Sequence, residues 1–389
     1  MNTNPSEDRL YFKHRLGLAG TYLLLSALFA AAVTHAVAGY TFTSLVDTTG
    51  AFSDFGPSYS ASLNASGCVA FRAALDDGRN GVFRANGTTV TTITTSAETF
   101  ASYSDPVINQ AGTVVFWAQD GPALTQKIMT GSGGPLVTIA DTTGQFREVY
   151  GNPSINAAGT VAFNGILRAG GSSIFVSNSA VTTPTGILAS TSTINDAGTM
   201  AFQGYLNGHY LIGASNGGPT TIIAVDSGPL KVFGRKPAIN NSGTVAFVAG
   251  IGDIDAGAYG IYSGNGGALT TIADLAGPFS YFDLFYGEPS INGTGTVAFF
   301  AGLDAGGYGV FTGDGVTTNE IIGLGDMLFG SPITGFGISP TALNDSGQLA
   351  FYYSLANGTS GLALATPTPE PSASLLLAAG ALLALRRRR

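Results

Sequence analysis

The chain has 389 residues, of which 44% are hydrophobic and only 10% are charged, so its composition is that of a folded protein and excludes intrinsic disorder. Between the two ends it is rich in Gly, Thr, Ser, Ala and Val, which favours an all-β fold over a helical one. Residues 39–365 contain 9 basic and 21 acidic side chains, hence a net charge of −12, which repels phosphate backbones and argues against a nucleic-acid partner.

Residues 1–38 have the three parts of a secretory signal peptide. A basic start is followed by an apolar stretch over residues 16–33, and Ala36 and Ala38 then form an A-x-A cleavage site before Gly39. We therefore expect export and removal of the segment after Ala38. The alternative is an uncleaved anchor, because an apolar stretch of this length is just able to cross a bilayer.

One motif, [I/L]-N-x-x-G-x-[V/L/M]-[A/V]-F, recurs seven times at spacings of 39–52 residues. The asparagines are Asn64, Asn109, Asn156, Asn195, Asn240, Asn292 and Asn344. Glycine follows three positions later, as Gly67, Gly112, Gly159, Gly198, Gly243, Gly295 and Gly347. Phenylalanine follows seven positions later, as Phe71, Phe116, Phe163, Phe202, Phe247, Phe299 and Phe351. A period of this length indicates a repeat architecture.

The motif has the features of a tight hairpin. Asparagine at the first position of a turn can bond its own backbone two residues on, and glycine three positions later provides a positive φ. The Val and Phe that follow alternate with small residues, as in a β-strand. We therefore expect a type I turn that ends in a left-handed glycine and leads into a strand anchored by the phenylalanine.

Two further strand patterns follow the phenylalanine in the first six repeats, and a short strand precedes each asparagine, so these repeats contain the four strands of a β-propeller blade. The last repeat ends near residue 365 without its fourth strand, whereas residues 40–52 match the fourth strand and turn of a middle repeat. We therefore predict a seven-bladed β-propeller over residues 39–365 that is closed by its N-terminal strand. Two stacked β-domains or an open β-array are the alternatives.

The motif is similar to that of bacterial proteins known as tandem NxxGxxxF-repeat proteins, and the similarity covers nearly all of residues 39–365. That family name describes a repeat, so the resemblance implies an architecture and no activity.

Few side chains between residues 39 and 365 have a catalytic pattern around them. His209 is the only histidine there, which excludes a His-rich zinc site, and it has no nucleophile-elbow motif beside it, so we expect a surface or turn residue. Cys68 is the only cysteine of the chain and stands where most repeats have Thr, so we expect it to pack against a neighbouring blade rather than to be a reactive thiol. Trp117 follows a motif phenylalanine and is expected to pack in the same way. No catalytic residue and no cofactor are assigned.

Two series of acidic residues follow the repeats. One lies in the turns after the motif strand, where equivalent turns of a propeller share a face: Asp76, Asp77, Asp120, Asp253, Asp255 and Asp304. Asp253 and Asp255 are weak candidates for Ca²⁺ binding, but the D-x-D-x-D-G pattern is absent and turn formation alone explains such residues. The other series ends the last strand of several repeats and is expected to cap turns: Asp47, Asp141, Asp226, Asp274 and Asp326.

The segment Lys231–Lys236 (KVFGRK) is the most irregular part of the repeats, because it carries three of the nine basic side chains of residues 39–365. We expect it to form a solvated turn. The alternative is part of an asymmetric active or binding site.

Residues 366–389 have three parts in order, which are Pro369-Glu370-Pro371, an apolar run over 372–385, and Arg386, Arg387, Arg388 and Arg389. This order resembles the PEP-CTERM sorting signal of Gram-negative bacteria. The resemblance implies recognition by an exosortase and a membrane helix with its arginines in the cytoplasm. It also implies release or transfer to the cell surface in bacteria that make exopolysaccharide. An ordinary tail anchor is the alternative.

The sequence therefore predicts an exported surface or matrix protein that binds or organises extracellular polysaccharide or another surface polymer without catalysis. A polysaccharide-active hydrolase or lyase on a propeller scaffold is the alternative, and it would break the repeat symmetry at one central cluster of side chains. An architectural protein without a ligand is a third hypothesis.

Overall fold

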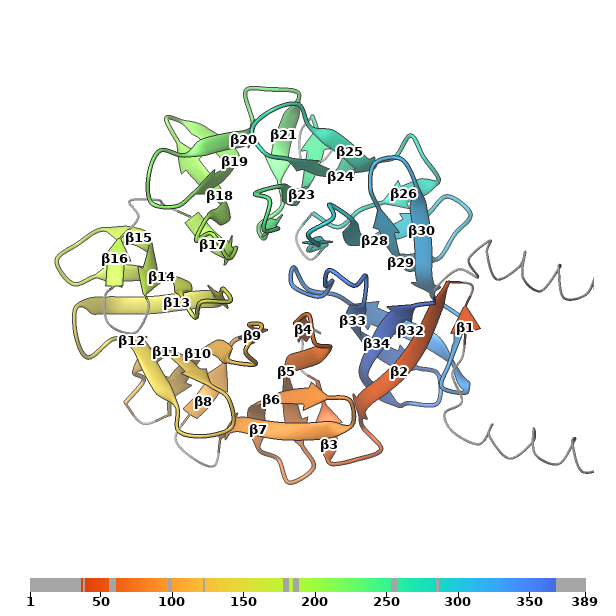
Figure 1. Ribbon diagram of the computed structural model, residues 1–389, viewed down its shortest axis with the longest axis horizontal. Coiled ribbons are helices and arrows are strands. Elements are labelled where there is room, and N and C mark those ends of the chain that lie inside the picture. The colour runs from red at the N-terminus through yellow and green to blue at the C-terminus, as the bar shows by residue number, and fades with distance from the viewer. Residues whose placement is uncertain are drawn as a thin grey trace, which may run out of the picture. The chain divides into compact units, whose positions relative to one another are not determined.

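Seven antiparallel sheets surround one axis in the computed structural model, which describes residues 36–37, 39–55, 61–96, 100–121, 123–177, 182–184, 189–252, 258–284 and 287–368 (Figure 1). These residues form strands and turns, and none of them lies in a helix long and apolar enough to cross a membrane. The rest of the signal-peptide segment and residues 369–389 lie outside the described residues. The prediction of an all-β, seven-bladed propeller is confirmed.

The first three sheets follow the repeats in order, with the strand nearest the axis first in the chain and often split in two. Blade 1 contains β3 (Phe52–Asp54), β4 (Ala61–Leu63), β5 (Cys68–Leu75), β6 (Asn80–Asn86) and β7 (Thr89–Thr95). Blade 2 contains β8 (Phe100–Tyr103), β9 (Val107–Ile108), β10 (Val114–Asp120), β11 (Gln126–Gly131) and β12 (Val137–Asp141). Blade 3 contains β13 (Phe146–Ile155), β14 (Val161–Leu167), β15 (Ser172–Ser177) and β16 (Thr182–Pro184).

The next three sheets repeat this order. Blade 4 contains β17 (Ala189–Ile194), β18 (Met200–Leu206), β19 (His209–Ser215) and β20 (Thr221–Val225). Blade 5 contains β21 (Leu230–Phe233), β22 (Ala238–Ile239), β23 (Val245–Ile251), β24 (Tyr259–Gly264) and β25 (Thr270–Ala273). Blade 6 contains β26 (Phe279–Tyr281), β27 (Ser290–Ile291), β28 (Val297–Leu303), β29 (Tyr308–Gly313) and β30 (Thr318–Gly323).

Blade 7 is assembled from both ends of the propeller. It contains β31 (Met327–Leu328), β32 (Ser331–Gly337), β33 (Leu349–Leu355) and β34 (Ser360–Pro367), followed by β2 (Tyr40–Asp47) and β1 (Ala36–Val37). Strand β2 pairs antiparallel with β34 from Tyr40 opposite Pro367 to Asp47 opposite Gly361. The predicted closure by the N-terminal strand is confirmed, and the alternatives of stacked β-domains and an open array are wrong.

The motif turns are of the kind expected from the sequence. The seven motif glycines have φ between 74° and 89°, a region that a side chain with a Cβ rarely adopts. Their N–H groups donate to the carbonyl of the motif asparagine, as from Gly112 to Asn109 at 3.0 Å. The seven motif phenylalanines are all buried.

The seven motif asparagines form a closed ring of hydrogen bonds around the axis. Each Nδ2 donates to the backbone carbonyl of the next motif asparagine at 2.9–3.4 Å, and Asn344 completes the ring by donating to Asn64. Each Oδ1 accepts the backbone N–H four residues further on at 2.9–3.0 Å. The bond to the second residue that the sequence predicted occurs as well at Asn64, Asn240 and Asn344. Each asparagine therefore stabilises its own turn and joins two blades.

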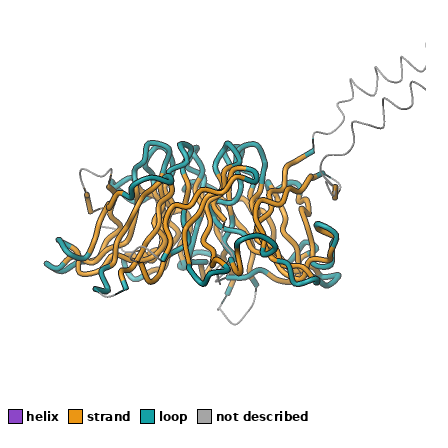
Figure 2. The backbone as a smooth tube through the Cα atoms, turned by 90° about the horizontal axis from the view of Figure 1, so that it is seen from below, coloured by secondary structure: helices purple, strands orange, loops and turns teal. Residues whose placement is uncertain are grey.

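The hydrophobic core lies between adjacent sheets. Cys68 and Val82 of blade 1, for example, pack in one cluster with Ile108 and Phe116 of blade 2. Seen from the side, the strands run between two faces of loops (Figure 2). Because each motif strand starts at its asparagine turn and runs away from it, the asparagine turns lie on one face and the hairpins after the motif strands lie on the other.

Replacing one ring asparagine tests how much the ring stabilises the fold. Asn240→Ala removes the donor to Asn292 and the acceptor for Thr244, and it leaves buried backbone groups without partners. We expect the free energy of unfolding to fall by about 2–4 kcal/mol in chemical denaturation. Asn240→Asp keeps the acceptor and loses the donor, and should also be destabilised. Asn216→Ala, at an exposed turn, is the control, and an equal loss there would contradict the role of the ring.

Candidate functional site

The position four residues before each motif asparagine breaks the symmetry of the repeats. It is occupied by Asp105 in blade 2, Asn152 in blade 3, Lys236 in blade 5 and Glu288 in blade 6, and each of these is followed by proline. Proline has no N–H to donate to the sheet. In blades 2, 5 and 6 the strand nearest the axis is interrupted at this point. The side chains that precede the prolines line a pocket on the axis.

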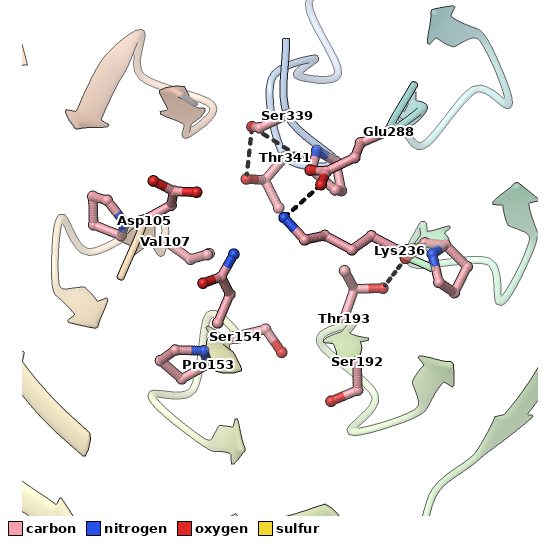
Figure 3. A pocket seen from close by; sticks show the side chains of 14 residues that line it. Asp105, Val107, Pro153, Ser154, Ser192, Thr193, Lys236, Glu288, Ser339 and Thr341 are labelled. Carbon is pink, nitrogen blue, oxygen red and sulfur yellow. Dashed lines mark hydrogen bonds and ion pairs between the residues drawn. The ribbon is translucent and has the colours of Figure 1, made fainter. Parts of the chain in front are cut away.

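This axial pocket is defined by residues of six blades. It is lined by Asp105, Pro106, Val107, Asn152, Pro153, Ser154, Ser192, Thr193, Lys236, Pro237, Glu288, Ser339, Pro340 and Thr341 (Figure 3). Its cavity of about 50 Å³ has room for a few water molecules. A small ion with its water can enter such a space, whereas a polymer chain cannot.

Three charged side chains face the axial pocket. Lys236 extends across it and places Nζ 2.5 Å from Oε1 of Glu288, while Asp105 lies on the opposite side of the pocket from the Lys236 backbone (Figure 3). Burial raises the pKa of the Glu288 carboxyl, Lys236 opposes that rise, and the charge of Asp105 adds to it. Asp105 forms an ion pair with Arg72, in which Nη2 of the arginine lies 3.9 Å from Oδ1 of the aspartate. This distance is too long for a hydrogen bond.

Hydroxyl groups complete the lining. Thr193 donates to the Pro237 carbonyl at 2.9 Å, and Ser339 donates to the Ala61 carbonyl at 2.7 Å. Thr341 donates to Ser62 at 2.9 Å. Their protons are therefore used within the protein, and their remaining lone pairs can accept. Ser154 is 4% exposed, and its buried Oγ has no hydrogen-bond partner in the structure.

A second surface feature is a row of aromatic side chains across blades 6 and 7, which we call the aromatic row: Tyr281, Tyr308, Phe300 and Phe336. Neighbouring ring centroids are 6.0, 5.6 and 5.7 Å apart in that order, and Phe300 and Tyr308 are stacked with an interplanar angle of 5°. Both tyrosines are 42% exposed. Tyr308 and Tyr281 are both paired across strands with Gly302, where an added Cβ would approach both side chains to 3.1 Å. The glycine therefore gives the two rings room to lie over the strand.

The hydroxyl group of Tyr281 is hydrogen-bonded to Asp283, two residues further along the chain. Burial raises the pKa of its hydroxyl, and so do the charge of Asp283 and the hydrogen bond to that carboxylate. The ring is thus held in place by its polar tip while part of its surface faces solvent.

The basic segment 231–236 divides between two environments. Lys231 is exposed and donates to the Asp226 carbonyl at 2.9 Å, as expected for a solvated turn. Lys236 is partly buried and reaches the axial pocket. The prediction of a solvated turn is therefore wrong for Lys236, because its ammonium pairs with the largely buried Glu288 carboxylate.

His209, Cys68 and Trp117 lie in the environments that the sequence predicts. His209 is exposed beside a two-residue hairpin turn, with Nδ1 2.6 Å from Oδ1 of Asp226. Cys68 is buried against blade 2, and Trp117 packs partly buried and donates from Nε1 to the Val149 carbonyl at 2.7 Å.

Four members of the acidic series at the strand ends cap turns, as predicted. The carboxylates of Asp47, Asp141 and Asp274 accept the N–H of the second residue after them at 2.8–2.9 Å. Asp326 accepts the N–H of Gly323 within its own turn. Asp226 instead accepts the N–H of Tyr210 on the neighbouring strand and pairs with His209, so the prediction of a turn cap is wrong for Asp226.

The acidic residues in the turns after the motif strands do not assemble a metal centre among the described residues. Asp77 pairs with Arg79 and Asp120 with Lys127, in each case within the same hairpin. No three His, Cys, Asp or Glu side chains of the described ranges lie close enough to hold a metal ion. Asp253 and Asp255 lie outside the described residues, and so do Ala38, the prolines and glutamate of the sorting motif and its arginines.

Sequence reasoning did not single out Asp105, Glu288, Ser154 or the aromatic row. The first two carry a signal that aligning the repeats would have revealed, since the residue four positions before the asparagine varies in charge while the motif does not. The aromatic row joins strands of two blades and has no such signal.

Comparisons with known proteins support the fold and leave the activity open. Residues 212–334 match a family described as one of unknown function, DUF7453, and no curated protein matches the chain. The Pyrococcus horikoshii acylaminoacyl peptidase superposes with a TM-score of 0.51 at 13% identity over 86% of this chain and 55% of that one, so this chain spans about half of the peptidase. Polysaccharide lyase Uly1 superposes with a TM-score of 0.48 at 10% identity, over 79% of this chain and 89% of the lyase. YCF48 bound to D1 peptide superposes with a TM-score of 0.44 at 11% identity, over 87% of this chain and 98% of that one. At 13% identity the likeness to the peptidase shows the fold alone.

The environment of Cys68 predicts an inert thiol in the folded protein. Burial raises its pKa, which lowers the thiolate fraction, and packing against blade 2 restricts access. We expect alkylation by iodoacetamide at pH 8 to be about 100-fold or more slower than at a cysteine placed at the exposed Val316, and to become rapid on unfolding. Native rates within tenfold of the Val316→Cys site would identify a reactive thiol instead.

Proposed function

We propose that this chain is an exported β-propeller that binds a neutral extracellular polysaccharide on its surface without catalysis. The observation that carries this proposal is the aromatic row, a set of neighbouring rings that continues from blade 6 to blade 7 with two tyrosines open to solvent.

Exposed aromatic rings suit a sugar polymer. A pyranose has an apolar face of C–H groups that packs on a ring, and a tyrosine offers an apolar face together with a polar tip. Because the rings of the row follow one another across two blades, successive sugar units can contact successive side chains. Clustered apolar surface of this kind is typical of an interaction site.

The net negative charge of the propeller favours a neutral polymer over an anionic one. Residues 39–365 carry a net charge of −12, so a polyanion is repelled over the whole approach to the protein. A neutral polysaccharide has no such penalty. Its binding would then be insensitive to salt, unlike binding that depends on charge.

The alternative function, hydrolysis or lysis of a polysaccharide, is favoured by one observation, since the axial pocket does break the repeat symmetry at its centre with Asp105, Lys236 and Glu288. Glycoside hydrolysis, however, needs two carboxyl groups on either side of a bound glycosidic bond. A cavity of about 50 Å³ does not admit that bond, so we favour binding over cleavage.

Export and surface sorting complete the proposal. Both terminal segments leave the propeller at blade 7, where the Thr368 N–H donates to the Gly39 carbonyl at 2.9 Å. The signal peptide and the sorting signal would therefore attach at one point of the ring. In this proposal the precursor is held in the inner membrane by its C-terminal helix, an exosortase processes it there, and the propeller then reaches the cell surface or the matrix.

Affinity electrophoresis in native gels that contain dextran or alginate tests the proposal with the full-length protein in mild detergent. We expect dextran to retard the protein and alginate not to do so. Tyr281→Ala with Tyr308→Ala should reduce the dextran affinity about tenfold or more.

A matched pair controls for the loss of any two exposed tyrosines. Tyr205 and Tyr210 of blade 4 are 55% and 54% exposed, and their ring centroids are 5.0 Å apart. Their double replacement should leave the retardation unchanged. An equal loss of dextran affinity in both double variants would contradict the assignment to the aromatic row. New reducing ends in the incubated polymer would show that the protein cleaves the polysaccharide.

A further inference from the structure

We propose that three tyrosines and an aspartate on the hairpin face of blades 5 and 6 bind a quaternary ammonium group of the choline type. We call this group of side chains the tyrosine site, and it consists of Tyr259, Tyr281, Asp283 and Tyr308. The inference goes beyond the polysaccharide proposal and does not rest on it, although the two ligands would share Tyr281 and Tyr308.

Two of the tyrosines occupy equivalent positions in neighbouring blades, at the start of the strand that follows the motif strand. Tyr259 pairs with Gly250, and Tyr308 pairs with Gly302. A Cβ added at Gly250 would lie 2.6 Å from the Tyr259 ring, and one added at Gly302 would lie 3.1 Å from the Tyr308 ring. The equivalent pairs of the other five blades contain no glycine. The two glycines therefore leave room for both rings to lie over the motif strands.

The third tyrosine makes a corner with one of these rings. Tyr281 and Tyr308 meet at an interplanar angle of 88°, with their ring centroids 6.0 Å apart, and both side chains are partly open to solvent. A cation within about 6 Å of a ring centroid is attracted by the electron-rich face of the ring. Because the two rings are perpendicular, a cation in the corner can contact both of them.

The hydroxyl ends of the tyrosines gather near one carboxylate. Burial raises the pKa of the Tyr281 hydroxyl, and so do the charge of Asp283 and the hydrogen bond to it. Tyr308 and Tyr259 add to this rise, so both lie close enough to interact with Tyr281 electrostatically. A neutral phenol does not cancel the charge of a carboxylate. The tyrosine site therefore combines aromatic rings with a negative charge.

The surrounding sequence favours a cationic occupant. Residues 237–368 contain ten acidic side chains and no lysine, arginine or histidine. All the basic side chains of residues 39–365 therefore precede the tyrosine site in the chain. The electrostatic potential of blades 6 and 7 is accordingly negative, which attracts a cation to the site.

The pair Tyr205 and Tyr210 of blade 4 shows what distinguishes the tyrosine site. Tyr210 is equivalent to Tyr259 and Tyr308, and its ring lies 5.0 Å from that of Tyr205 at an angle of 60°. The carboxylate beside this pair, Asp226, is 2.6 Å from His209, and its backbone carbonyl accepts a hydrogen bond from Lys231 at 2.9 Å. Blade 4 thus has the aromatic rings without an uncompensated negative charge.

Hydration selects the kind of cation. The ammonium of a lysine or another primary amine is strongly hydrated and must exchange its water for acceptors. A trimethylammonium group has no N–H to satisfy, and its methyl groups pack on ring faces as in the aromatic cages that recognise choline. The tyrosine site is open to solvent, so we expect a Kd of about 1–10 mM.

A ligand-observed NMR titration of the full-length protein in a maltoside detergent tests the inference. The ligands are choline and 3,3-dimethylbutan-1-ol, which has the same shape without the charge. We expect choline to bind about tenfold or more tightly than the alcohol. Tyr281→Ala should weaken choline binding about tenfold, and Asp283→Asn, which keeps an acceptor for the Tyr281 hydroxyl, should weaken it about threefold.

The double variant Tyr205→Ala with Tyr210→Ala is the matched control and should bind choline unchanged. Equal affinities for choline and the alcohol, or no saturable choline signal, would overturn the inference. An equal loss in the control variant would overturn it as well. If Tyr281→Ala does not fold, the ratio of the two ligands and Asp283→Asn decide.

Two further measurements separate this inference from the polysaccharide proposal and identify the source of the ammonium group. Asp283→Asn should leave the retardation by dextran unchanged, since a neutral sugar does not respond to the lost charge. Sedimentation with phosphatidylcholine vesicles, and not with phosphatidylglycerol vesicles, would assign a lipid headgroup as the ligand. Choline binding without sedimentation would assign a soluble compound, and equal sedimentation with both kinds of vesicle would contradict recognition of the ammonium.

Discussion

The asparagine ring is the interaction on which the rest of the structure depends. Each side chain uses both ends of its amide, since Oδ1 accepts within its own turn while Nδ2 donates to the carbonyl of the next blade. Only an amide of this length does both, because a carboxylate has no donor and a hydroxyl is too short. The ring therefore couples the conformation of every turn to the spacing of the blades. Replacing one asparagine removes hydrogen bonds in its own turn and to the next blade.

The ring also explains how an asymmetric site arises on a symmetric scaffold. Once the asparagines hold the inner ends of all blades, the residues four positions earlier face the axis and are not needed for the turn. They vary as Asp105, Asn152, Lys236 and Glu288, so charge collects at the one place where all blades meet. The repeated inner ends of the blades form the wall of the pocket, and the residues that differ between repeats provide its charged groups.

The axial pocket and the aromatic row use different properties of the propeller. The axial pocket is small, and its two carboxylates each face a cationic side chain. The aromatic row is open, extended and apolar, and it suits a chain of sugars.

The sequence by itself determined the number of blades, the type of turn, the phenylalanine anchors and the closing strand. These features are local or periodic, so fixed offsets along the chain reveal them, and the missing fourth strand of the last repeat points to residues 40–47. Tertiary structure alone decided that Lys236 meets Glu288 of the neighbouring blade, that Ser154 lacks a partner, and that Phe300 and Phe336 of different blades lie side by side. Such contacts join repeats about 50 residues apart, and their existence depends on how closely the blades approach, which no spacing along the chain encodes.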